Sequence, residues 1–130
     1  MIRLRILMLV VAAAIALPAT ASAEPGLTRV SLSSNATYVS QQQINLEVAL
    51  TCPEGLFYSV GASVLQQQGL FTQVFGNGFT SGPCTGKHQK VAVSVFSFSF
   101  PGWQLGDALA YVSACSFTCD STSKTIRIGL

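Results

Sequence analysis

Charged residues are scarce in this chain. They make up 9% of its 130 residues, as 7 Lys+Arg and 5 Asp+Glu. Nucleic-acid binding needs several clustered cations to neutralise phosphates, so this composition excludes a protein that binds nucleic acid through a basic patch. The chain has only one histidine, His88, which leaves little for acid–base catalysis. Its length accommodates a single domain and excludes most multi-domain enzymes.

The chain also lacks an apolar run long enough to span a membrane. The run Ile6–Leu17 has 12 residues, whereas a spanning helix needs about 20. Two arginines precede this run and the small-residue motif Ala21-Ser22-Ala23 follows it, as in a secretory signal peptide. We therefore expect residues 1–23 to be a signal peptide cleaved after Ala23. The mature chain, 24–130, is then a secreted (extracellular) domain without a membrane span.

Removal of the expected signal peptide makes the chain neutral. Five cations then face five anions: Arg29, Lys87, Lys90, Lys124 and Arg127 against Glu24, Glu47, Glu54, Asp107 and Asp120. Such a charge-poor surface does not steer charged ligands from a distance. It also offers little electrostatic protection against self-association.

The four cysteines, an even number in a small secreted chain, predict two disulfides. We favour Cys52–Cys84 with Cys115–Cys119, closures that stabilise by roughly 3.7 and 2 kcal/mol in the loop-entropy description. The rival pairing joins Cys52 to Cys115 and Cys84 to Cys119, which resembles the inter-sheet bridge of immunoglobulin domains. A zinc site is the third alternative, and the spacing fits it poorly.

Hydrophobicity alternates with a period of two along the mature chain, and no 3.6-residue period extends over ten residues. The clearest case is Ile44–Cys52, in which the even-numbered positions are apolar and direct Cys52 toward the core. About seven short strands are expected, at residues 27–32, 44–52, 57–67, 70–75, 91–100, 105 or 107 to 114, and 124–130. The glycines and Pro83 in segment 76–83 predict a loop region around Phe79. Turn signals every eight to twelve residues then predict an antiparallel, immunoglobulin-like β-sandwich.

The parity of the apolar positions changes within residues 91–100. Val91, Val93 and Val95 are odd, whereas the phenylalanines at 96, 98 and 100 are even. One inserted residue produces such a change, so the pattern predicts a β-bulge near Val95–Phe96. The alternative is a strand that is buried on both faces where the parity changes.

Several short motifs resemble a group of small secreted actinobacterial domains of uncharacterised function. The match lies in Cys84-Thr85-Gly86, His88, Gly106-Asp107-Ala108 and the pair Cys115/Cys119, and it extends over roughly residues 51–130. The resemblance implies an immunoglobulin-like fold and no established activity, so it transfers no functional residue. Ser113 stands where the tyrosine corner of true immunoglobulin domains leads to a cysteine, and this departure favours the Cys52–Cys84 pairing.

The residues that could carry catalysis are few. His88 could act as a general base with Asp107 or Asp120 as its orienting acid, but the spacing sets no geometry, and a surface histidine is the simpler interpretation. Glu47 on the polar side of a strand and Glu54 in a turn are typical of solvated acids. We expect no catalytic residue, no cofactor and no metal site.

Four aromatic residues within eight positions are the most suggestive feature: Phe96, Phe98, Phe100 and Trp103. One interpretation places them partly in the core, with Trp103 covering one end of the fold. The other makes them an exposed patch that binds a partner.

These observations predict a secreted, non-catalytic binding or surface-interaction module. Its partner is expected to be a protein or a glycan at the cell surface, and the sequence does not define the oligomeric state. The first alternative is a structural, envelope-associated protein that self-assembles. The second is a small secreted hydrolase that uses His88.

Overall fold

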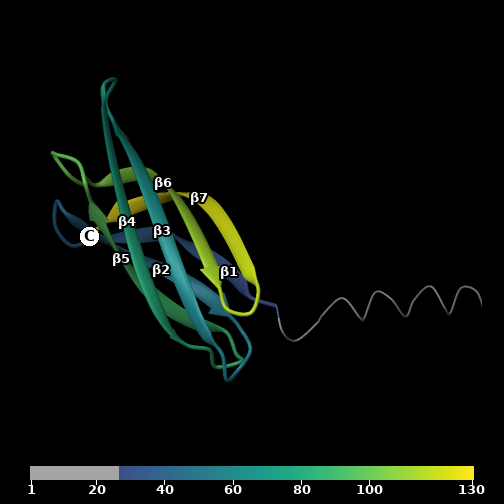
Figure 1. Cartoon of the computed structure of the whole chain (residues 1–130). Coiled ribbons are helices and arrows are strands. Elements are labelled where there is room, and N and C mark those ends of the chain that lie inside the picture. Colours follow the sequence, from purple (N-terminus) through teal and green to yellow (C-terminus); the bar gives the residue numbers. More distant parts are fainter. Residues whose placement is uncertain (1–26) are drawn as a thin grey trace, which may run out of the picture.

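The computed structural model describes residues 27–130, which form seven β-strands and no helix. The strands are β1 (Arg29–Tyr38), β2 (Gln43–Thr51), β3 (Phe57–Gln68), β4 (Thr72–Pro83), β5 (Gln89–Ser97), β6 (Gly106–Cys115) and β7 (Cys119–Gly129) (Figure 1). The expectation of an all-β protein of about seven strands is confirmed. The predicted signal peptide, 1–23, lies outside the described residues.

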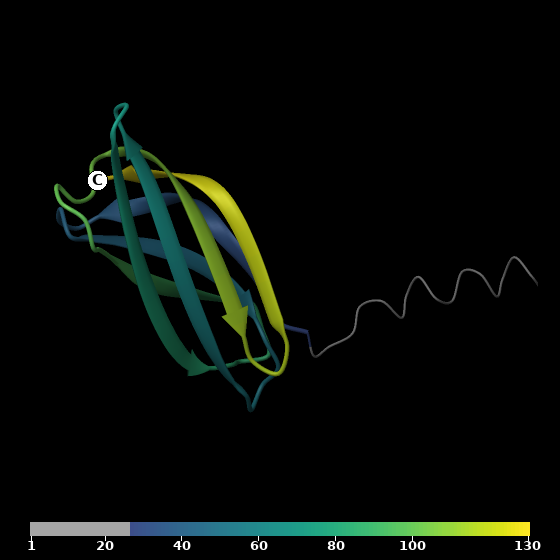
Figure 2. The same cartoon turned by 45° about the horizontal axis from the view of Figure 1, so that its top comes forward.

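The strands close into a barrel in the order β1-β2-β5-β4-β3-β6-β7 (Figure 2). The predicted immunoglobulin-like sandwich is therefore wrong, because every strand is hydrogen-bonded to a neighbour on both sides and the sheet returns to β1. All neighbouring strands are antiparallel except β1 and β7, which pair in parallel.

Two short ladders close the barrel, and each depends on a local irregularity. A register shift between Leu32 and Ala36 lets β1 pair with β2 at both of its ends and with β7 through Asn35–Thr37. β4 and β5 share only the pairs Gly76↔Ser97 and Asn77↔Phe96. A side chain at Gly76 would collide with the backbone of Phe96, so glycine is needed for this close approach.

Alternating side chains fill the barrel interior. The even-numbered positions of β2, from Ile44 to Cys52, are buried as predicted. Valine and alanine from β3, β5 and β6 meet them, and large aliphatic residues come from β2 and β7. The branched side chains suit the pleated strands and pack densely between them.

The β-bulge predicted near Val95–Phe96 is wrong. The β2–β5 ladder runs without a register shift from Leu50↔Gln89 to Gln43↔Phe96. Val91, Val93 and Val95 point inward, and the phenylalanines at even positions point outward. The parity of the apolar residues changes because the outer surface of this segment is itself apolar.

The strand β4 is longer than expected. The segment 76–83, with its glycines and Pro83, was predicted to be a loop, yet it pairs with β3 along its whole length. Gly76 and Gly78 occupy inward positions where β5 crosses β4 closely. Their role is close backbone approach and not a turn.

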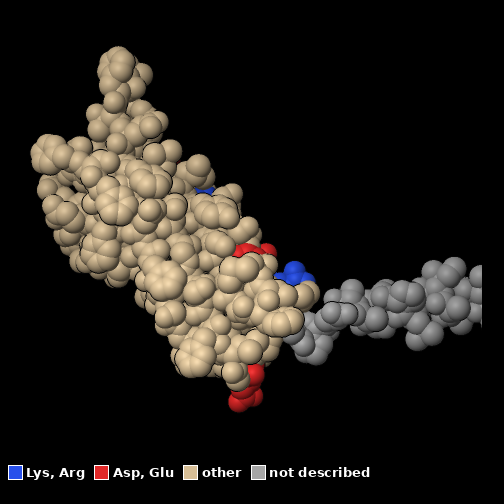
Figure 3. Space-filling view, in the orientation of Figure 1, with Lys and Arg blue, Asp and Glu red and all other residues tan. Residues whose placement is uncertain are grey.

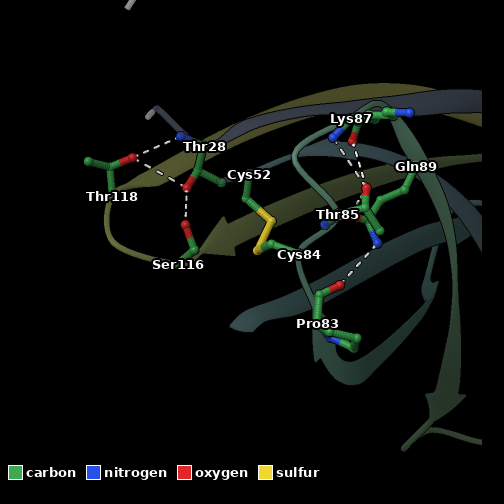
Figure 4. Close-up of a disulfide and its surroundings, with 9 residues drawn as sticks. All are labelled: Thr28, Cys52, Pro83, Cys84, Thr85, Lys87, Gln89, Ser116 and Thr118. Carbon is green, nitrogen blue, oxygen red and sulfur yellow. Dashed lines mark hydrogen bonds between the residues drawn. A yellow bond between two sulfur atoms is a disulfide. The ribbon is translucent and has the colours of Figure 1, made fainter. Parts of the chain in front are cut away.

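Both favoured disulfides, Cys52–Cys84 and Cys115–Cys119, are confirmed, and the described chain contains no free cysteine. Cys52–Cys84 connects the ends of β2 and β4, and its sulfurs lie close to a hydroxyl cluster (Figure 4). In this cluster the Thr28 hydroxyl lies 2.7 Å from that of Ser116, and the Thr28 amide donates to the Thr118 hydroxyl. These bonds attach the start of β1 to the β6–β7 turn.

The β5–β6 connection covers the opposite end of the barrel. Trp103 is 1% exposed, and its backbone amide donates to the Gln41 carbonyl in the β1–β2 turn. Gln66 of β3 is almost fully buried and is bonded to the Gln104 backbone on both sides, donating to its carbonyl and accepting from its amide. Gln68 donates to the Gly102 carbonyl. Gln66 and Gln68, at the end of β3, therefore hold this connection in place.

Candidate functional site: an aromatic, charge-free face

The residues considered for catalysis are not brought together. His88 is exposed in the β4–β5 connection, and no hydrogen bond or ion pair joins it to a carboxylate among residues 27–130. Asp107 instead pairs with Arg127 at 3.6 Å, and Asp120 accepts a hydrogen bond from the Val30 amide.

The remaining acidic residues are also solvated or paired. Glu47 and Lys90 form an exposed ion pair at 3.3 Å across β2 and β5, and Glu54 is exposed in the β2–β3 turn. No group of three or more His, Cys, Asp or Glu side chains within the described residues is placed to hold a metal ion.

The four-residue aromatic cluster divides into two parts. Trp103 is buried and closes the barrel end, as the first interpretation expected for it. Phe96, Phe98 and Phe100 are exposed, with Phe100 almost completely so. The three phenylalanines are thus available to a partner, and Trp103 is not.

None of the eight phenylalanines of the chain lies in the core, and at least 42% of each is exposed. Phenylalanine is usually among the most buried residue types. Scattered exposed apolar residues are ordinary, but the complete exclusion of one large apolar type from the core is not. The unusual feature of this protein therefore lies on the outer surface of the barrel.

Four of these phenylalanines lie on, or directly after, neighbouring strands on one side of the barrel. We define the aromatic face as the outward side chains Leu65, Phe75, Phe79, Phe96, Phe98, Leu109 and Tyr111. Strand register places them side by side: Leu65 lies opposite Phe75 on β4 and Leu109 on β6. The Phe98 amide donates to the Phe75 carbonyl, and the two rings lie 6.4 Å apart. The face therefore extends over four neighbouring strands.

No charged side chain interrupts this face. Segments 55–86 and 91–106 contain no Lys, Arg, Asp or Glu. In the space-filling view the surface over β3 and β4 shows neither basic nor acidic atoms, which appear only toward one side and one end of the molecule (Figure 3). The face is thus both apolar and electrically neutral.

The aromatic face is large for a protein of this size. With about 200 Å² for each aromatic side chain and slightly less for leucine, the exposed fractions correspond to roughly 700 Å² of surface. The largest apolar patch on a typical monomer is about 300–600 Å². A partner in a standard protein–protein interface contributes about 800 Å².

A concave surface lies over β1, β2 and β5, and its lining is more polar than the aromatic face. It is a groove of about 540 Å³, lined by Ser33, Asn35, Thr37, Asn45, Leu46, Glu47, Lys90, Val91 and Ala92. Asn45 is held by hydrogen bonds from Gln43 and Ser94. We call this surface the polar groove; its lining includes no aromatic residue.

The sequence predicted Phe96 and Phe98 of the aromatic face, with Phe100 outside it, and missed the other members of the face. Phe75 alternates with the buried Val74 and the inward Gly76, and Leu109 and Tyr111 alternate with buried alanines and Val112. That alternation was available in the sequence. Alternation alone does not show which side faces outward when both sides of a strand carry apolar residues.

No protein-family model matches the chain, and no curated protein is detectably similar to it in sequence. The resemblance to secreted actinobacterial domains therefore stays a prediction. Within residues 27–130 there is also no helix of the length and apolarity needed to cross a bilayer.

Proposed function

We propose that this protein is a secreted, non-catalytic binding module that contacts its partner through the aromatic face. The observation that carries the proposal is the exposure of all eight phenylalanines, four of which share one charge-free surface with leucine and tyrosine. Leaving so much apolar area in water opposes solubility. A contact surface is the simplest reason for a protein to retain it.

Secretion is supported by the two disulfides, which are typical of an oxidising compartment. The amino-terminal pattern of a signal peptide agrees with this location.

The chemistry of the surface favours a protein partner over a glycan. Sugar recognition combines hydrogen-bonding side chains with aromatic rings that stack on the sugar. Here the amides and hydroxyls of the polar groove lie over β1, β2 and β5, whereas the exposed rings of Phe75, Phe79 and Tyr111 lie on β4 and β6. An uncharged apolar partner surface matches the aromatic face directly.

The proposal is tested by retention of the purified, oxidised protein on cell-envelope fractions. The double variant Phe75→Asp/Phe98→Asp places two charges on the aromatic face without altering the core. Phe117→Asp is the control, because Phe117 is also an exposed phenylalanine but lies in the β6–β7 turn. We expect the double variant to lose retention and the control to keep it. Equal retention of the wild type, the double variant and the control would show that the aromatic face does not mediate binding.

A further inference from the structure

We propose that the occupant of the aromatic face is a second copy of this chain, so that two barrels pack face to face in a two-fold dimer. This inference rests on the proposed function, since it assigns a partner to the same surface. The area agrees with it: the apolar side chains expose roughly 700 Å², and polar residues between them bring the face near the 800 Å² that each partner gives to a stable interface.

The absence of charge removes the usual obstacle to contact between identical surfaces. In a two-fold dimer each residue near the axis faces its own copy, so a charged residue there meets a like charge. Segments 55–86 and 91–106 supply most of the aromatic face and carry no charge. Asp107 of β6 lies toward the edge and is paired with Arg127.

Strand register makes the face complementary to itself. The outward positions in the middle of β3, Ser59, Gly61 and Ser63, are small, and a side chain at Gly61 would meet nothing within 4 Å. Gly61 lies between Phe79 of β4 and Ser113 of β6. A two-fold axis parallel to β3 places the β4 side of one copy over the β6 side of the other. Phe79 of each copy then lies over the small residues Gly61 and Ser113 of its partner.

The neighbouring rows match in the same arrangement. Ser63 lies between Asn77 and Tyr111, so the amide of one copy lies over the phenol of the other. In the next row Leu65 lies between Phe75 and Leu109, so apolar side chains meet apolar side chains. Each row thus places a larger side chain over a smaller one, with the larger residue on β4 in the Gly61 and Leu65 rows and on β6 in the Ser63 row. Interdigitation of two packed sheets requires such a match.

The association is measured by sedimentation of the purified, oxidised protein over a range of concentrations, at low and high salt. We expect a concentration-dependent dimer. Its dissociation constant should not rise with salt, because no ion pair contributes to the aromatic face. A protein that stays monomeric at every concentration overturns the inference.

Two independent variants test which surface is used. Phe75→Asp/Phe98→Asp introduces charges into the interface, and Gly61→Arg fills the open space at the axis. Both sites face outward, so near-ultraviolet circular dichroism should match the wild type. We expect each variant to weaken dimerisation on the order of 100-fold, as for central interface residues. Phe117→Asp, at the far turn, should dimerise like the wild type. A dimer that neither variant weakens contradicts the inference.

Other occupants give different results. A monomer that floats with phosphatidylcholine vesicles, and loses this in Phe75→Asp/Phe98→Asp, assigns the face to a lipid surface and overturns the dimer. A monomer retained on envelope fractions through the same residues overturns the dimer and leaves the proposed function standing. A dimer that is not retained on any envelope fraction supports the dimer and removes the wider binding function.

Discussion

The two outer surfaces of this barrel are built on the same alternating strands but differ in every property that governs binding. The aromatic face over β5, β4, β3 and β6 is apolar and charge-free, and glycine and serine separate its large side chains. The polar groove over β1, β2 and β5 is lined by amides, hydroxyls and one ion pair. Both cover the same kind of aliphatic core.

The difference shows that the core does not determine the outer surface of a strand. Inward positions are occupied by Val, Ala, Ile and Leu on both sides, so burial places no demand on the outward positions. Those positions are free to carry charge, as in Glu47 and Lys90, or phenylalanine, as in β4. The choice of phenylalanine on one side only is therefore a functional signal.

The largest effect is expected from Trp103, the most deeply buried aromatic residue of the described chain. Trp103→Ala removes a side chain that lies beneath Gly76, and the resulting cavity should lower the free energy of unfolding by about 3–5 kcal/mol. Phe100→Ala, three residues earlier and almost fully exposed, is the control and should change it by less than about 0.5 kcal/mol. Urea denaturation of both variants measures this contrast. Equal losses would mean that Trp103 and Phe100 are not divided between core and surface.

The next largest effect concerns the bond that joins the two sides. Cys52–Cys84 connects β2, which carries part of the polar groove, to β4, which carries part of the aromatic face. Replacing both cysteines with alanine should cost roughly 3–4 kcal/mol in unfolding free energy, since a long loop is released. The Cys115→Ala/Cys119→Ala variant opens a short loop and should lose roughly 2 kcal/mol. Thermal unfolding of the two variants measures these losses. A larger loss in the Cys115→Ala/Cys119→Ala variant would contradict the prediction that the bridge closing the longer loop contributes more stability.

The aromatic face should contribute to association and little to stability. Phe75→Asp/Phe98→Asp should change the free energy of unfolding by less than about 1 kcal/mol at concentrations where the protein is monomeric, because both rings are exposed. Urea denaturation at low protein concentration checks this. A loss of several kcal/mol would show that the phenylalanines belong to the core.

The smallest effect is expected on the polar side. Glu47 and Lys90 are largely exposed, so the variant Glu47→Gln should lower stability by at most about 1 kcal/mol. It should leave dimerisation unchanged, because the pair lies away from the aromatic face. Sedimentation of the variant and the wild type measures this. Weaker association of Glu47→Gln would indicate that the dimer interface lies over the polar groove and not over the aromatic face.

The sequence predicted the parts of the fold that depend on local pattern. Alternation in β2 placed Cys52 inward at the strand end, and the tight spacing of Cys115 and Cys119 predicted a turn. Barrel closure was not predictable in this way. It depends on three parallel pairs between β1 and β7 and two pairs between β4 and β5. Such non-local ladders have no local sequence signature.

The candidate site was only partly predictable for a different reason. Phe96, Phe98 and Phe100 were noticed because they are close in sequence. Phe75, Leu65 and Leu109 join them only through strand register, which pairs residues far apart in the chain. Phe96, Phe98 and Phe100 form an outward row, and the pattern predicted a β-bulge because apolar residues usually point inward. Strand register and the direction of each side chain, both set by tertiary structure, therefore determine which residues share the aromatic face.

The central claim is that the phenylalanines lie on the outside of the barrel, and ¹⁹F NMR with fluorinated phenylalanine and tryptophan tests it most directly. With a soluble paramagnetic agent added to dilute protein, all eight phenylalanine resonances should relax faster, and the Trp103 resonance should not. Raising the protein concentration should then protect Phe75 and Phe98 but not Phe117. Phenylalanine resonances as protected as Trp103 at every dilution would contradict the account.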